Sequence, residues 1–179
     1  MAKNIQNETS MKKLNSWFGI DEQQYCLYIL QGYEFDITED RVIWRLNGQL
    51  HREDGPAIIW ADGTRVWYLN GQLHREDGPA VIWPDGRQER VLNGLWHRED
   101  GPAIIRATGT QVWYLNGQIH REDGPAVVRS DGRQEWYLNN QLHREDGPAY
   151  IGADGRQEWY LNGQEYTEQD FNEKIKLLV

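Results

Sequence analysis

The sequence predicts an all-β fold: an array of antiparallel β-hairpin repeats with a 23-residue period, bounded by a non-repeating N-terminal cap and a short C-terminal helix. Three observations predict it. Asp-Gly and Asn-Gly pairs follow short apolar runs through the middle of the chain, and a Leu-Asn doublet recurs every 23 residues. A constant interval of this length is typical of stacked repeat proteins. The heptapeptide His-Arg-Glu-Asp-Gly-Pro-Ala occurs at the same interval, beginning at His51, His74, His97, His120 and His143.

Residues 1–40 lack the repeat and form the predicted cap. A helix is expected near Asp21–Leu30, and Gly19 and Gly32 limit its length, because glycine is unfavourable inside helices. Cys26 is the only cysteine, which excludes an internal disulfide and a cysteine metal cluster. We expect Cys26 in the core of the cap rather than as a nucleophile.

Residues 41–163 form the predicted array. In each unit one apolar run meets an Asp-Gly or similar turn, and a second run, such as residues 65–69, meets an Asn-Gly turn. Both residues of these pairs tolerate positive φ angles, which makes the pairs strong hairpin signals. The frequent Gly and Pro residues leave no helical apolar period. We therefore expect two short strands per unit, joined by alternating tight turns.

Alternation along these strands assigns residues to a core face. The alanine of the heptapeptide never varies, the residue two places later is always Ile or Val, and a leucine precedes each recurring asparagine. The opposite face is mixed and carries Val, Glu, Trp and Arg. The predicted core includes Ala57, Ala80, Ala103, Ala126 and Ala149, with Ile59, Ile82, Ile105, Val128 and Ile151.

Residues 164–179 form the predicted C-terminal capping helix. Thr167 followed by Asp170 resembles a capping box, with Asp in place of the usual Glu. Acidic residues come early in this stretch and Lys174 and Lys176 come late, which suits the helix dipole. We expect this helix to close the open end of the array.

The repeat resembles the MORN type (membrane occupation and recognition nexus), which shares the 23-residue unit, with an aromatic residue before Asn-Gly and a histidine after it. The resemblance covers roughly residues 43–163 and is clearest at residues 67–74. The chain departs from the usual pattern in two ways: Arg-Glu-Asp separates the histidine from the glycine, and the leading Tyr-x-Gly is missing. It is therefore similar to variant repeat proteins of bacteria, phages and large DNA viruses. The resemblance implies a hairpin array used for binding or scaffolding, without one defined activity.

Composition narrows the partners and the location. The net charge of -9 disfavours nucleic acid and anionic membranes as partners. No stretch approaches about 18 consecutive apolar residues, so no membrane span is expected, and the first residues lack the apolar core of a signal peptide. We therefore expect a cytoplasmic protein, in the cytoplasm of a host cell if a phage encodes it. The sequence leaves the oligomeric state open and is compatible with a homo-oligomer.

The recurring His-Arg-Glu-Asp suggests metal or acid–base chemistry, but geometry disfavours both. With two strands per unit, equivalent residues lie on the order of 10 Å apart in a sheet. That is too far for two histidines to share a zinc ion, whose bonds are about 2.0–2.1 Å long. All five histidines are repeat copies, so none is singled out as a general base. We expect the arginine of one unit to pair with Glu or Asp of the next unit in a structural ladder, with no metal or other cofactor and no enzymatic activity.

Function is expected where the units differ, because a residue shared by all units builds the unit. The third unit replaces a Trp-Tyr pair by Arg90-Val91 and an aliphatic position by Trp96. A row on the mixed face changes along the array from Trp to Arg, and both are typical hot-spot residues. The predicted binding residues are Trp60, Trp83, Arg90, Trp96, Arg106 and Arg129.

These residues lead to two functional hypotheses. In the first, the chain is a non-catalytic scaffold that holds a protein partner along the mixed face through Trp and Arg contacts. In the second, it is a phage-type anti-defence protein that sequesters a small nucleotide, with Arg90, Arg106 or Arg129 on phosphate and a Trp on the base. A purely structural alternative has Trp60 and Trp83 packed on the cap and the arginines paired with acids.

Overall fold

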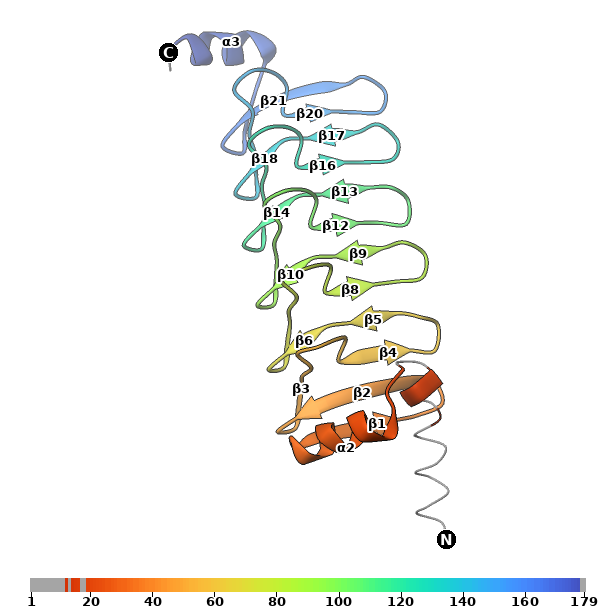
Figure 1. Cartoon of the computed structure of the whole chain (residues 1–179). Helices are drawn as coiled ribbons and strands as arrows, with labels where there is room; N and C mark the ends of the chain where they lie inside the picture. The colour runs from red at the N-terminus through yellow and green to blue at the C-terminus, as the bar shows by residue number, and fades with distance from the viewer. Residues whose placement is uncertain (1–11, 13, 17–18, 178–179) are drawn as a thin grey trace. The chain divides into compact units, whose positions relative to one another are not determined.

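The computed structural model describes residues 12, 14–16 and 19–177, and it confirms an all-β array of antiparallel hairpins with a short C-terminal helix. The chain divides into two compact units, Met1–Leu73 and His74–Val179 (Figure 1). The first unit holds the cap and the first copy of the heptapeptide, and the second unit holds the other four copies. Each copy forms a loop, here called a motif loop; these loops are residues 51–57, 74–80, 97–103, 120–126 and 143–149.

In the first unit, helix α2 (Glu22–Leu30) lies beside a sheet with the strand order β1-β2-β4-β5, while β3 pairs with β2 and β6 pairs with β7. The strands are β1 (Tyr33–Ile37), β2 (Arg41–Leu46), β3 (Gln49–Leu50), β4 (Ile58–Trp60), β5 (Arg65–Val66), β6 (Tyr68–Leu69) and β7 (Gln72–Leu73). The buried core of this unit contains Leu14, Ile20, Tyr28, Tyr33, Val42, Trp44 and Ala57.

Helix α2 confirms the helix expected in the cap. Asp21 is its N-cap, and the Asp21 carboxylate accepts a hydrogen bond from the backbone amide of Gln24 at 2.8 Å. Tyr28 is the buried residue of the helix. The prediction for Cys26 is wrong, because Cys26 is exposed. It lies two positions before Tyr28, which places the two side chains on different sides of the helix.

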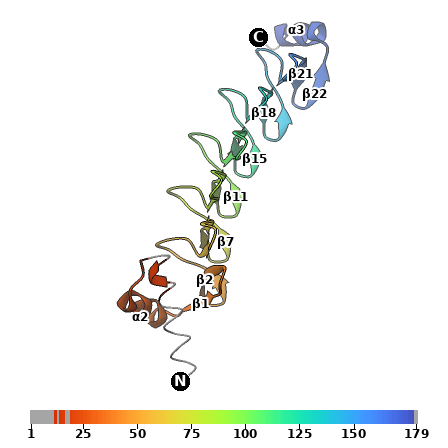
Figure 2. The same cartoon turned by 90° about the vertical axis from the view of Figure 1, so that its right-hand side faces the viewer.

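The second unit stacks one hairpin per repeat into a continuous antiparallel sheet with the order β8-β9-β12-β13-β16-β17-β20-β21-β22 (Figure 1). These strands are β8 (Val81–Ile82), β9 (Gln88–Glu89), β12 (Ile104–Ile105), β13 (Gln111–Val112), β16 (Val127–Val128), β17 (Gln134–Glu135), β20 (Tyr150–Ile151), β21 (Gln157–Leu161) and β22 (Gln164–Tyr166). Small side hairpins accompany the sheet (Figure 2): β10 (Val91–Leu92) with β11 (Leu95–Trp96), β14 (Tyr114–Leu115) with β15 (Gln118–Ile119), and β18 (Tyr137–Leu138) with β19 (Gln141–Leu142).

The prediction of two strands per unit is wrong, because these repeats contain four short strands. The strand expected across residues 111–115 is interrupted at Trp113, whose backbone amide donates to the carbonyl of Ala126 at 2.8 Å. The residues after the Asn-Gly turn pair back with those before it to form the side hairpin, as Gln118 does with Leu115. The interruption therefore joins the backbone of the tryptophan to the following motif loop.

The motif histidines link consecutive repeats through the turns that begin at the recurring asparagines. Asn116 has a φ of 50°, a conformation that asparagine tolerates in such turns. Nδ1 of His97 accepts a hydrogen bond from the backbone amide of Asn116 at 3.2 Å and lies 2.9 Å from its side-chain amide oxygen. The same backbone hydrogen bond, to the asparagine 19 residues later, is made by His51, His74, His120 and His143.

The motif alanines are buried as predicted, with exposed fractions of 0–1% at Ala57, Ala80, Ala103, Ala126 and Ala149. The prediction for the aliphatic row is wrong in the second unit. Ile104 and Val127 are buried there, whereas Ile105 and Val128 are half-buried. The alanine lies in a bend before the strand, so alternation counted from it is shifted by one residue, and a shift of one exchanges the two faces.

Helix α3 (Glu168–Lys176) confirms the predicted C-terminal helix. Thr167 is its N-cap, and Oγ1 of Thr167 accepts a hydrogen bond from the backbone amide of Asp170 at 3.2 Å. Phe171 is the buried residue of the helix, which lies against β21 and β22 at the end of the sheet. No helix among the described residues is long and apolar enough to cross a membrane.

We expect Ala126→Leu to lower the free energy of unfolding by about 1–3 kcal/mol, because a fully buried position has no space for the larger side chain. Ala107→Leu is the matched control, since Ala107 is exposed in the turn between β12 and β13, and it should change the free energy by less than about 0.5 kcal/mol. Urea unfolding followed by circular dichroism measures both. Equal effects would contradict the burial of the alanine row.

Candidate functional site

The arginine of each motif loop holds the loop in one shape. Nε of Arg121 donates to the carboxylate of Asp123 at 2.8 Å, and its Nη1 donates to the carbonyl of Pro125 at 3.3 Å. The prediction that this arginine pairs with an acid of the next unit is wrong, because the ion pair lies within one loop. A Cβ atom on Gly124 would lie 3.1 Å from the guanidinium carbon, so the glycine leaves room for the arginine. The same two hydrogen bonds recur at Arg52, Arg75, Arg98 and Arg144.

A tryptophan lies against this guanidinium. The guanidinium carbon of Arg121 is 4.3 Å from the ring centre of Trp113, and that of Arg144 is 4.2 Å from the ring centre of Trp136. Such cation–π contacts contribute about 0.5–2 kcal/mol. This contact was not among the predictions from the sequence. The constant interval of eight residues between tryptophan and arginine is the signal that could have identified it.

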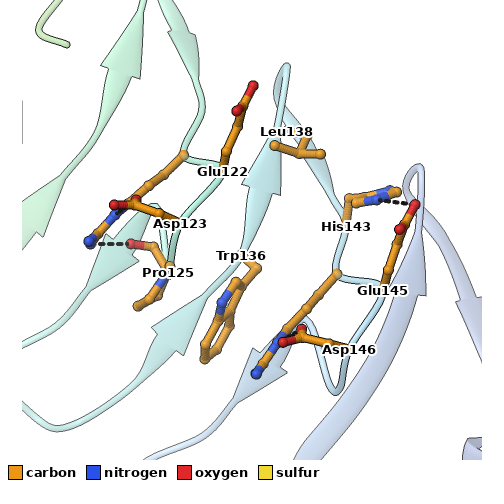
Figure 3. Close-up of a pocket in the computed structure, with 11 residues that line it drawn as sticks. Glu122, Asp123, Pro125, Trp136, Leu138, His143, Glu145 and Asp146 are labelled. Carbon is orange, nitrogen blue, oxygen red and sulfur yellow. Dashed lines mark hydrogen bonds and ion pairs between the residues drawn. The ribbon is translucent and has the colours of Figure 1, made fainter.

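Successive motif loops enclose a cavity with this tryptophan in its wall. The cavity between loops 120–126 and 143–149 has a volume of about 660 Å³ and includes Trp136 and Leu138 in its lining. Figure 3 shows Trp136 between the two loops, with their carboxylates around it. Trp136 is half-buried, so part of its aromatic surface is available to a ligand. A second cavity, of about 690 Å³, has Trp113 at the equivalent position.

The rim of each of these two cavities is acidic. Two arginines and four carboxylates line the cavity at Trp136. A hydrogen bond from Arg121 holds the pKa of Asp123 below its ordinary value, and Arg144 does the same for Asp146. The glutamate of the motif loop is strongly exposed, as for Glu122, whose side chain is 85% exposed. The cavity therefore combines an aromatic wall with a negative rim.

In the first unit the equivalent wall is covered by the cap. Trp44 is fully buried, and the side chain of Arg52 is 8% exposed, compared with 25% for Arg121. The guanidinium carbon of Arg52 lies 4.4 Å from the ring centre of Trp44 and 5.7 Å from that of Tyr28. The hydroxyl of Tyr28 also donates to the carboxylate of Asp54. A tyrosine on a helix thus completes the arginine–tryptophan group that borders open cavities in the second unit.

The predicted row on the mixed face lies at the hairpin turns. In the first unit, the guanidinium carbon of Arg41 is 5.1 Å from the ring centre of Trp60. In the second unit, Arg87 lies 4.8 Å from the ring centre of Trp83, at the turn between β8 and β9. Each of these tryptophans therefore has a cationic neighbour, Arg41 on the strand paired with Trp60 and Arg87 in the same hairpin as Trp83.

The predicted arginines of the row differ from one another. Arg129 follows β16, and its Nε donates to the buried carboxylate of Glu135 at 2.9 Å. Arg106 follows β12 at the equivalent turn and is exposed. Burial raises the pKa of Tyr114 above its ordinary value, and the positive charge of Arg106 opposes this shift.

The remaining two predicted residues lie elsewhere in the same repeat. Trp96 is in β11, where its indole nitrogen donates to Glu89 at 3.0 Å and its ring centre lies 5.0 Å from that of Tyr114. Arg90 lies in the wall of a cavity between two motif loops. The six predicted residues therefore lie in three separate kinds of structural element, which are hairpin turns, a side hairpin and a cavity wall, and they do not form one site.

The arrangement supports binding through stacking, hydrogen bonds and charge. Within the described part of the chain, no three His, Cys, Asp or Glu side chains gather as ligands for a metal ion. In sequence comparisons the chain matches no protein-family model and no curated protein. The resemblance to MORN repeats stays a prediction.

We expect Arg121→Lys to lower the free energy of unfolding by about 1–2 kcal/mol, because an ammonium group cannot donate a fork of hydrogen bonds or stack its plane on Trp113. Arg133→Lys is the matched control. Arg133 pairs with Asp131 on the exposed surface, where an ion pair contributes little. Urea unfolding measures both variants, and equal losses would show that the stacked geometry contributes nothing.

The pair of Arg121 and Asp123 predicts the sign of an acid effect. The pKa of Asp123 is lowered in the folded state by its hydrogen bond from Arg121. The pair therefore stabilises the fold above the ordinary carboxyl pKa, and this contribution is lost as the pH falls through the lowered pKa. Between about pH 5 and about pH 2, the urea midpoint of Asp123→Asn should fall less than that of the wild type. A steeper fall in Asp123→Asn would contradict this assignment.

Proposed function

We propose that this chain is a non-catalytic binding scaffold whose second unit holds a segment of a protein partner in the cavities between motif loops. The proposal rests on one arrangement of side chains that recurs in the walls of two cavities. An arginine stacks on a tryptophan beside an aspartate, and a cavity of similar volume adjoins both Trp113 and Trp136. Equivalent sites at a regular spacing suit an extended partner that enters several of them at once, which raises the overall affinity.

The first unit indicates which side chain of the partner would occupy these cavities, namely a tyrosine. There Tyr28 stacks beside Arg52 and donates its hydroxyl to Asp54. Asp123 holds the same place beside Arg121 in the second unit. A partner tyrosine would contact the guanidinium with its ring and donate to the carboxylate with its hydroxyl. Binding of this kind involves no making or breaking of covalent bonds.

The charge of the cavities favours a partner segment with positive net charge. Both tryptophan cavities are lined by two arginines and four carboxylates. The carboxylates bonded to arginine are largely compensated, and the exposed glutamates are not. Complementary charge on the partner would speed association and orient the segment, with a smaller effect on affinity.

This proposal keeps the protein partner expected from the sequence but moves the contact from the hairpin turns to the cavities. Trp83 and Arg129 are engaged with Arg87 and Glu135 at the turns. The cavities instead provide concave surfaces with partly buried aromatic anchors, which are typical of binding hot spots. A cytoplasmic location, in a host cell if a phage carries the gene, is part of the same proposal.

Affinity capture from cells of the source organism tests the site. The full chain should retain its partner, and the double variant Trp113→Ala, Trp136→Ala should reduce the retained amount by about tenfold or more, because truncating aromatic anchors costs about 2 kcal/mol or more. Trp83→Ala is the matched control outside the cavities and should have no effect. Loss of the partner in Trp83→Ala alone would place the contact at the hairpin turns, and retention by every variant would exclude both sites.

A further inference from the structure

One cavity of the second unit has an arginine in place of its tryptophan. Arg90 occupies the position that Trp113 and Trp136 hold in the next two repeats. Its backbone is held in the same way, since its amide donates to Ala103 at 2.7 Å and its carbonyl accepts from the amide of His97 at 3.1 Å. The exchange therefore changes the wall of the cavity and leaves the backbone of the repeat unchanged.

Three arginines line this cavity. It lies between motif loops 74–80 and 97–103, has a volume of about 360 Å³, and contains Arg75, Arg90 and Arg98 in its lining. Arg98 follows Arg90 by eight residues, so the guanidinium of Arg98 has another arginine at the position where other motif arginines have an indole. The chemistry of the wall changes from aromatic to cationic.

Two carboxylates near this cavity are already bound to arginine. Asp77 pairs with Arg75 at 2.8 Å, and Asp100 pairs with Arg98 at 2.7 Å. Within the described residues, no carboxylate lies at ion-pair distance from the guanidinium of Arg90. Among the three arginines of this cavity, Arg90 is therefore the one whose guanidinium forms no ion pair with a described carboxylate.

Two further carboxylates of the cavity, those of Glu76 and Glu99, repel an anion, as the motif-loop glutamates do in the tryptophan cavities. The side chains of Glu76 and Glu99 are 83% and 84% exposed, so solvent and salt screen their charge. The pKa of Arg90 is lowered, first by burial and then by the positive charges of Arg98 and Arg75. Burial is the largest cause, and the negative charges of Asp100 and Asp77 raise the pKa against the two arginines.

We propose that this cavity binds a phosphate monoester, with Arg90 as its direct ligand and Arg75 and Arg98 as supporting positive charges. A guanidinium presents a planar fork of N–H donors that matches two oxygens of a phosphate group. The volume of about 360 Å³ falls in the range of small-molecule sites, about 300–1,000 Å³, and admits an organic group attached to the phosphate. The site does not depend on the partner segment proposed for the tryptophan cavities.

Titration of the full chain with inorganic phosphate at an ionic strength of about 0.15 M, by calorimetry and by NMR of the arginine Nε–H groups, tests this site. We expect one site per chain. Arg90→Trp installs the residue of the next repeats, so it should fold normally, and it should weaken phosphate binding by about tenfold or more. Arg106→Ala removes an exposed arginine outside the cavity and should leave binding unchanged. No phosphate binding, or equal binding by Arg90→Trp, would overturn the proposal.

The converse substitution supplies a second test. Trp113→Arg should create the same arginine group in the following cavity and raise the stoichiometry to two phosphates per chain, with thermal melting as the check on folding. A stoichiometry of one in the folded variant would count against the arginine group as the site.

Adenosine monophosphate and phosphoserine then distinguish the source of the phosphate. Tighter binding of the nucleotide indicates a free small molecule, and tighter binding of phosphoserine indicates a modified side chain of a protein.

Discussion

The rest of the array depends on the guanidinium of the motif arginine. It closes its own loop through hydrogen bonds to an aspartate and a proline carbonyl, as Arg121 does. Arg52, Arg121 and Arg144 also stack on the tryptophan eight residues earlier. Most strands of the repeats have only two residues, so their ladder hydrogen bonds alone provide few links between repeats. Side chains supply the other links. The arginine ties the loop to the interrupted strand, and the histidine ties it to the next Asn-Gly turn.

The contact between a motif arginine and a tryptophan occurs both under the cap and in the walls of the open cavities. A repeat array has ends that lack a neighbour, and caps cover them. In the first unit, Tyr28 supplies an aromatic ring beside Arg52 and a hydroxyl for Asp54. In the second unit, the wall formed by a stacked arginine and tryptophan borders open space between two loops. The cap therefore provides, within this chain, an example of the side chain that such a wall accepts.

The tryptophan position can change its chemistry without loss of the repeat. At Arg90 the backbone keeps the hydrogen bonds made at Trp113, because those bonds come from the main chain and not from the indole. The neighbouring Arg98 still closes its own loop through Asp100 and a proline carbonyl. The same backbone arrangement therefore carries cavities with different linings, with a tryptophan in the wall in two repeats and an arginine in another. The difference depends on a single side chain.

The sequence by itself determined the period, the all-β class, both helices and the burial of the motif alanines, because each follows from a local signal such as a turn pair, a capping residue or an invariant small residue. It also singled out Arg90 as a departure from the repeat. It did not determine which aliphatic row is buried, since the bend at Ala103 shifts the alternation by one residue. The stacking of arginine on tryptophan, and the grouping of Arg75 and Arg98 with Arg90, were decided by the tertiary structure alone. The stacking requires the side hairpin β14–β15 to bring Arg121 back onto Trp113. The arginine group requires loops from successive repeats to face each other, which depends on how one repeat packs on the next.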